Sequence, residues 1–215
     1  MNRVGLVRTI ACVALAALAL SCETAARAAP TVFHSGPLNH TVPRTFDGTS
    51  LNLVTVQFDD TGPLSGDWDI NFWSLSGTLA IEPLDAYALR VVVDDAGYAA
   101  VLQRGDRIAS TSAFAHTADL SPEWLAGVDG YLGIEFLCGG RFGGMPTDQI
   151  CYGYIHIESG DASGFPATII NYAFDIAELP IIIDDVPTCW IKSETIFCDG
   201  FNSVAGMQSS RDAAP

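Results

Sequence analysis

Positive charge is scarce in this chain of 215 residues. Lysine and arginine together number 10, against 25 aspartates and glutamates, and the formal net charge is −15. Lysine occurs once, as Lys192. Nucleic acids and anionic membrane surfaces attract proteins through clustered basic side chains. We therefore expect no nucleic-acid partner and no charge-driven attachment to a membrane surface.

Long hydrophobic runs are also missing. The longest apolar stretch, residues 10–20, has eleven residues, whereas a membrane-spanning helix needs about 20. Arg3 and Arg8 precede this stretch, and the small residues Ala26 and Ala28 follow it. This layout is typical of a cleaved secretory signal. We predict a signal peptide over residues 1–28, no transmembrane segment, and a secreted, periplasmic or outer-surface location.

A second processing route is open at the same segment. The sequence from Ala19 to Cys22 reads Ala-Leu-Ser-Cys, which approximates the cleavage box of a bacterial lipoprotein. In that route Cys22 carries a lipid and anchors the mature chain. In the other route Cys22 is removed with the signal. Both routes take the protein out of the cytosol.

Short catalytic motifs are absent from the whole sequence. It has no HExxH zinc motif, no GxSxG nucleophile elbow, no P-loop and no GxGxxG dinucleotide fingerprint. Histidine, the most frequent general base, occurs four times. The sequence therefore favours a protein that is not an enzyme.

Alternation of apolar and polar residues dominates, and helical periodicity is rare. Residues 67–75 alternate cleanly and predict a half-buried strand, whereas residues 50–58 are apolar on both faces and predict one inner strand. Residues 88–93 and 98–103 are β-rich and are joined by Asp-Asp-Ala-Gly, which predicts a hairpin.

A meander of three strong strands follows, at residues 131–138, 151–158 and 167–176, after a brief helical turn beginning at Ser121. We predict an all-β fold, an antiparallel β-sandwich or jelly roll of about ten short strands over residues 30–186. A short Cys-bracketed C-terminal tail over residues 187–215 completes the chain.

Four cysteines lie beyond the predicted signal. An even number in an exported chain predicts disulfides, and four thiols allow three pairings. Proximity favours two short loops, one of which closes the C-terminal tail. Zinc is a weaker alternative, because the spacings are not paired CxxC and only His156 lies near. The favoured pairs are Cys138 with Cys151 and Cys189 with Cys198.

Glu135 and Glu158 lie on adjacent predicted strands and are the candidate catalytic pair. A glycoside hydrolase needs two carboxyl groups about 5 to 10 Å apart. The register of the two strands decides whether these side chains meet. The simpler interpretation is that both are charges on a solvated strand face.

Aromatic side chains project from the last two predicted strands of the meander, where they could stack against sugar rings. The simpler interpretation is that they are cross-strand core pairs. These candidate ligand-binding residues are Tyr152, Tyr154, Tyr172 and Phe174.

Asp67, Asp69 and Asn71 resemble the start of a calcium loop, since Ca²⁺ prefers oxygen ligands. Phe72 stands where the loop needs glycine, and the glutamate at the twelfth position is missing. Solvated turn acids are the alternative. Calcium is the one cofactor that the sequence suggests.

Several short motifs resemble those of uncharacterised exported β-rich proteins from proteobacteria. The tail, Ile196 to Phe201, is similar to a C-terminal I-F-x-D-G-F-E signature of exported gammaproteobacterial proteins, with Asn202 in place of the glutamate. The resemblance implies export and a β-rich fold, and it implies no catalytic residue. The other motifs are Phe46-Asp47-Gly48, Gly66-Asp67-Trp68-Asp69-Ile70-Asn71, Tyr131-Leu132-Gly133 and Tyr152-Gly153-Tyr154.

These observations predict a non-enzymatic β-sandwich with a binding or structural role at the cell surface. The expected partners are a cell-surface glycan or the export and sorting machinery. The alternative is a carbohydrate-active protein, either a lectin-like module or a jelly-roll glycoside hydrolase.

Overall fold

The computed structural model describes residues 32–61, 68–84, 88–141, 146–184, 188–192 and 195–199. The predicted signal peptide, Cys22 and the residues after 199 lie outside the described residues. For residues 188–192 and 195–199 the description covers the backbone.

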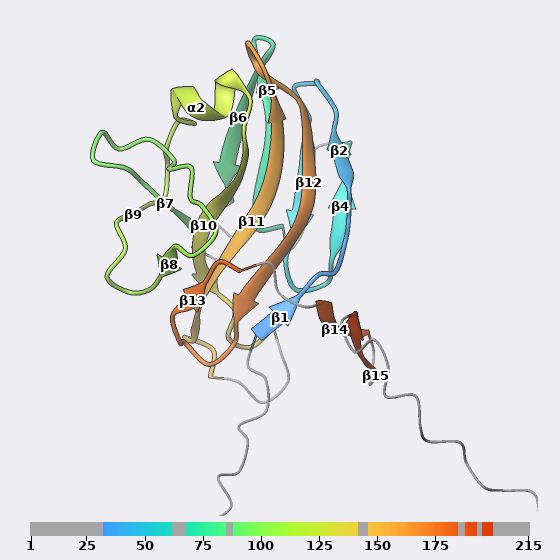
Figure 1. Cartoon of the computed structure of the whole chain (residues 1–215), viewed down its shortest axis with the longest axis vertical. Helices are drawn as coiled ribbons and strands as arrows, with labels where there is room; N and C mark the ends of the chain where they lie inside the picture. Colours follow the sequence, from blue (N-terminus) through green and yellow to red (C-terminus); the bar gives the residue numbers. More distant parts are fainter. Residues whose placement is uncertain are drawn as a thin grey trace, which may run out of the picture. The chain divides into compact units, whose positions relative to one another are not determined.

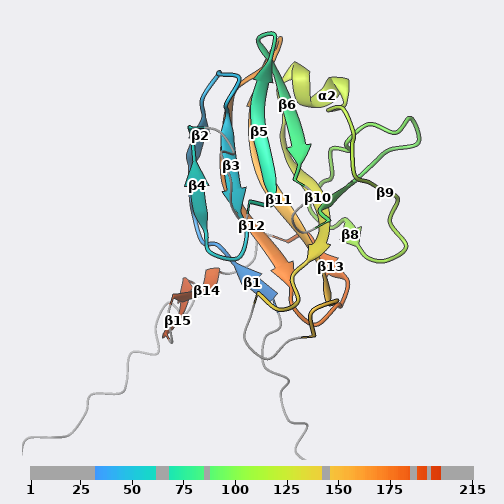
Figure 2. The same cartoon turned by 180° about the vertical axis from the view of Figure 1, so that it is seen from behind.

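Two antiparallel sheets form a sandwich, as Figures 1 and 2 show. The strand order of the larger sheet is β1-β12-β11-β10-β7-β9, with β2 also paired to β12. Its strands are β1 (Val32–His34), β2 (His40–Val42), β7 (Arg90–Val92), β9 (Phe114–Ala115), β10 (Asp129–Leu137), β11 (Ile150–Gly160) and β12 (Gly164–Asp175). The smaller sheet has the order β4-β3-β5-β6, with β3 (Thr49–Asn52), β4 (Gln57–Asp59), β5 (Ile70–Leu75) and β6 (Thr78–Pro83).

The main core lies between the two sheets. Leu51, Ile70 and Phe72 come from the smaller sheet, and Phe136 and Phe174 come from the larger one; all are almost completely buried. Alternation along each strand directs every second side chain into this layer. The predicted all-β antiparallel sandwich and the meander β10-β11-β12 are therefore confirmed.

The larger sheet is covered on its other face as well. A second cluster packs Ile108, Ile181 and Ile183 with Tyr131 and Tyr154. Its covering layer includes the short pair β8 (Arg107–Ile108) and β13 (Ile181–Ile182). Because both faces of β10 are buried, apolar side chains occur on both faces of residues 131–137.

One predicted strand was wrong, and one predicted hairpin is shorter than expected. Residues 50–58 fold as the hairpin β3-β4, because the Asn52 side-chain oxygen accepts hydrogen bonds from the amides of Val54 and Thr55 and turns the chain. The predicted hairpin of residues 88–93 with 98–103 forms only next to its turn, where Val93 and Ala99 form an antiparallel bridge and the Ala100 amide donates to the Val92 carbonyl oxygen; farther along, Leu102 pairs with Tyr131 of β10 instead. The intervening turn is as predicted, with the Asp94 carboxylate accepting bonds from the amides of Ala96 and Tyr98.

The predicted helical turn and one predicted disulfide are confirmed. Helix α2 (Pro122–Ala126) begins after Ser121 and ends at Gly127, which has a φ of 93°. The Cys138–Cys151 disulfide closes the loop between β10 and β11.

The tail contains the hairpin β14 (Thr188–Lys192) and β15 (Thr195–Asp199), with Cys189 directly opposite Cys198 in the ladder. This register suits the second predicted disulfide. The bond itself stays a prediction, because the side chains of both residues lie outside the description.

Candidate functional site

A row of polar side chains crosses three neighbouring strands on the outer face of the larger sheet. In the ladders, Glu135 of β10 stands opposite Arg90 of β7 on one side and Tyr152 of β11 on the other. Residues directly opposite in antiparallel strands share a face and have closely spaced Cβ atoms. The register therefore brings Arg90, Glu135 and Tyr152 together.

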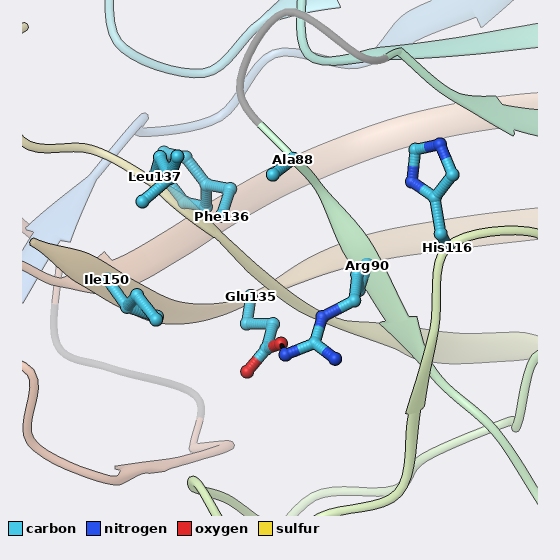
Figure 3. A pocket seen from close by; sticks show the side chains of 7 residues that line it. All are labelled: Ala88, Arg90, His116, Glu135, Phe136, Leu137 and Ile150. Atoms are coloured by element: carbon cyan, nitrogen blue, oxygen red, sulfur yellow. Dashed lines mark ion pairs between the residues drawn. The ribbon is translucent and has the colours of Figure 1, made fainter. Parts of the chain in front are cut away.

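Glu135 and Arg90 form an ion pair (Figure 3). The two partners differ in exposure, since the Glu135 side chain is 6% exposed and that of Arg90 is 48% exposed. Burial raises the pKa of Glu135, and the Arg90 charge opposes this rise without cancelling it. Burial also raises the pKa of Tyr152, and the nearby Glu135 charge adds to that rise.

Phe114 of β9 completes the surroundings of this pair. Its ring stacks on Tyr152, with centroids 6.2 Å apart, and the Arg90 guanidinium carbon lies 5.8 Å from the Phe114 centroid. The guanidinium therefore has a carboxylate on one side and an aromatic face near another. These two contacts restrict the orientation of a half-exposed arginine.

A hollow of about 460 Å³ opens beside the ion pair. Figure 3 shows the Glu135 carboxylate and the Arg90 guanidinium facing one another, with His116 set apart from them. The His116 Nδ1 atom lies 3.0 Å from the Leu89 carbonyl oxygen, so Nδ1 donates to this oxygen. The lining residues are Ala88, Arg90, His116, Glu135, Phe136, Leu137 and Ile150.

The hollow combines a buried carboxylate with a half-exposed guanidinium. Glu135 is the one carboxylate among the described residues that line the hollow. Arg90 carries five N–H donors, and a single carboxylate does not use all of them. The site thus offers spare donors and a carboxylate beside apolar walls, a combination typical of small-ligand sites.

The two predicted catalytic carboxylates are not brought together, which corrects that hypothesis. Glu158 pairs with Asp129, whereas Glu135 pairs with Tyr152, six positions away along β11. At about 3.3 Å per residue the two positions are about 20 Å apart. That distance is too long for the carboxyl pair of a glycosidase.

The four predicted ligand-binding aromatics lie on opposite faces of the larger sheet. Tyr152 and Tyr154 belong to the outer cluster, while Tyr172 and Phe174 are buried between the sheets. The Tyr172 hydroxyl donates a 2.7 Å hydrogen bond to the Leu53 carbonyl oxygen. The four residues therefore form no common platform, and Tyr172 and Phe174 serve the core.

The predicted calcium ligands have another arrangement. Asp69 is fully buried and pairs with Arg141, the Arg141 Nη1 atom lying 2.5 Å from Asp69 Oδ1. Asn71 is also buried, and Asp67 lies outside the described residues. Within the described parts of the chain, no three His, Cys, Asp or Glu side chains converge as a metal site. Of the three predicted calcium ligands, Asp69 is therefore paired with an arginine.

Sequence reasoning missed Arg90 and His116. Arg90 begins the short strand β7, His116 directly follows β9, and neither belongs to a motif. Their places in the lining of the hollow depend on the pairing of β7 with β10 and β9, which joins residues far apart in the chain. The sequence signal for this site was Glu135, a glutamate in an otherwise apolar strand.

Comparisons with protein-family models, curated proteins and solved structures find no match to this chain. Among the described residues, no helix has the length and apolar character to cross a membrane.

Proposed function

We propose that this protein is an exported, non-enzymatic binding module that acts at the cell surface and holds a glycan unit in the hollow at Arg90 and Glu135. The observation that carries the proposal is a buried carboxylate beside a half-exposed guanidinium, within a hollow of about 460 Å³. The disulfide is in keeping with export, because disulfides persist in oxidising compartments.

The charge balance of the pair favours a neutral, hydroxyl-rich ligand. Arg90 already neutralises Glu135, so a charged ligand would leave one charge of the site unpaired. A sugar hydroxyl can accept a bond from a spare Arg90 donor and donate one to the Glu135 carboxylate. The apolar side chains of Leu137 and Ile150 would contact the face of the sugar ring.

The test is a glycan array probed with the secreted, purified protein, alongside Glu135→Gln. Glu158→Gln is the matched control, because Glu158 is an exposed carboxylate on the same sheet face. We expect wild type and the Glu158 variant to retain the same glycans, and the Glu135 variant to lose at least tenfold in affinity.

Three outcomes would contradict the proposal. They are an array without bound glycan, equal losses in both variants, and release of reducing sugar from a bound glycan. Cell fractionation tests export separately, since a reduced cytosolic protein with residues 1–28 intact would remove the premise of surface binding.

A further inference from the structure

The smaller sheet ends in a strand with a free edge. Strand β6 is the last in the order β4-β3-β5-β6, and among the described residues no further strand pairs with it. It follows β5 through a two-residue turn, Ser76 and Gly77, both with positive φ. Leu75 and Thr78 close this hairpin and therefore form a hydrogen-bonded pair. Figure 2 shows β6 at the margin of the sheet nearer to α2.

The hairpin register decides which backbone groups of β6 point outward. Hydrogen-bonded and non-bonded pairs alternate, so the amides and carbonyls of Leu79 and Ile81 are directed away from β5. The Leu79 amide donates to the Ser163 carbonyl oxygen at 2.8 Å. Ile81 thus directs one N–H and one C=O outward from the edge of the sheet. Pro83, the next residue whose backbone faces outward, has no N–H to donate.

A groove follows this edge. Two hollows of about 750 and 470 Å³ lie along β6, and both are lined by Ile81, Ala118 and Asp119. Residues 116–120 and helix α2 line the groove together with β6. The six residues of β6 give the groove about 20 Å of strand, enough for a peptide of similar length.

The lining of the groove indicates the kind of occupant. Leu75 and Tyr98 are 52% and 41% exposed, although both are large hydrophobic residues. Glu82 and Asp119 are exposed acids in the lining. Among the described residues that line the two hollows there is no lysine or arginine. Apolar contact and negative charge together suit an apolar segment that carries basic side chains.

We infer that the free edge of β6 binds an extended, cationic segment of another protein as an added β-strand. The backbone of that segment pairs with Ile81, its apolar side chains contact Leu75 and Tyr98, and its basic side chains face Glu82 and Asp119. A second copy of this chain is disfavoured as occupant, because it brings a net charge of −15 to an acidic groove.

The first experiment uses the whole mature protein and a labelled synthetic peptide that alternates valine and lysine, with binding followed by fluorescence anisotropy. We expect Asp119→Lys to weaken binding at least tenfold. Asp148→Lys, at an exposed acid that lines neither hollow, should bind as wild type does. Glu135→Gln should also bind the peptide normally, which separates this site from the proposed glycan site.

A second measurement distinguishes strand addition from charge attraction. The bound peptide should slow hydrogen exchange of the Ile81 amide at least tenfold, and a peptide methylated on its backbone nitrogens should lose both binding and this protection. Equal effects of the two aspartate substitutions would overturn the inference, as would unchanged exchange at Ile81. A concentration-dependent dimer that the peptide fails to dissociate would assign the edge to a second copy instead.

Discussion

Among the described residues, the Asp69–Arg141 and Glu135–Arg90 pairs differ in burial and in the hydrogen bonds that surround the carboxylate. Asp69 and Arg141 are both buried, and the Asp69 carboxylate also accepts the Leu53 amide at 2.7 Å. Glu135 is nearly as buried as Asp69, but its partner Arg90 is half-exposed and lies beside a hollow.

The difference teaches which pair is structural and which is available to a ligand. The Asp69 carboxylate receives two bonds from Arg141, and Arg141 also donates to the Asn52 side chain, so the pair joins the β10–β11 loop to β3 and β5. A buried charge is stable where several hydrogen bonds surround it. The Glu135 pair keeps donors facing the hollow, which is what binding requires.

The largest effect should come from breaking the Asp69 pair. Asp69→Asn leaves the buried Arg141 without its counter-charge, and we expect a loss of about 3 to 5 kcal/mol in unfolding free energy. Glu135→Gln should cost less than about 1 kcal/mol, because Arg90 is in contact with water. Urea unfolding of both variants measures the difference. Similar losses would refute the distinction between the pairs.

Removal of the Cys138–Cys151 disulfide should have the next largest effect. The bond closes a loop with a sequence separation of 13 residues, and its replacement by two alanines should cost about 3 kcal/mol. Arg141 lies in this loop. In the variant without the disulfide, Asp69→Asn should therefore cost less than in wild type, while the cost of Glu135→Gln should stay the same. A double-mutant cycle measures this coupling, and strict additivity at Asp69 would contradict it.

The Tyr172 hydroxyl supports the Asp69 region from the opposite sheet. Tyr172→Phe removes its bond to the Leu53 carbonyl oxygen, and we expect a loss of about 1 to 3 kcal/mol, the cost of a buried acceptor left without its donor. Tyr98→Phe, at an exposed tyrosine, is the control and should stay within about 0.5 kcal/mol. Equal thermal stability of the two variants would show that the bond contributes little.

The smallest effect is a pH dependence at Glu135. Burial raises its folded-state pKa, so the folded protein holds a proton that the unfolded chain releases. This contribution to stability is complete below about pH 4.3, the usual glutamate pKa, and it is lost as pH rises through the raised value. The unfolding free energy of wild type relative to Glu135→Gln should therefore fall across that window. A rise would mean that Arg90 outweighs burial.

Local patterns predicted the elements whose neighbours in space are also neighbours in sequence. The meander β10-β11-β12, the turn at Asp94 and the Cys138–Cys151 bond all join nearby segments. The hairpin proposed for residues 88–93 and 98–103 forms only next to its turn, because Leu102 pairs with Tyr131 of β10 instead of continuing along β7. Long-range pairing leaves no periodic signal in the sequence.

The candidate site shows the same limit. Glu135 stood out as an acid within an apolar strand, but the sequence paired it with Glu158, which the ladder puts at the far end of β11. Its real neighbour, Arg90, is 45 positions earlier in the chain, as the two residue numbers show. Register, which alternation leaves open, decides such partnerships.

The sequence by itself determined the class of fold, the acidity of the protein and the disulfide of the β10–β11 loop, because strand periodicity, composition and short spacings are local properties. Only the tertiary structure decided which faces are covered, which carboxylate faces a hollow and which edge of the sandwich is free. These follow from the pairing of distant strands, whose free energy comes from contacts that no single segment contains.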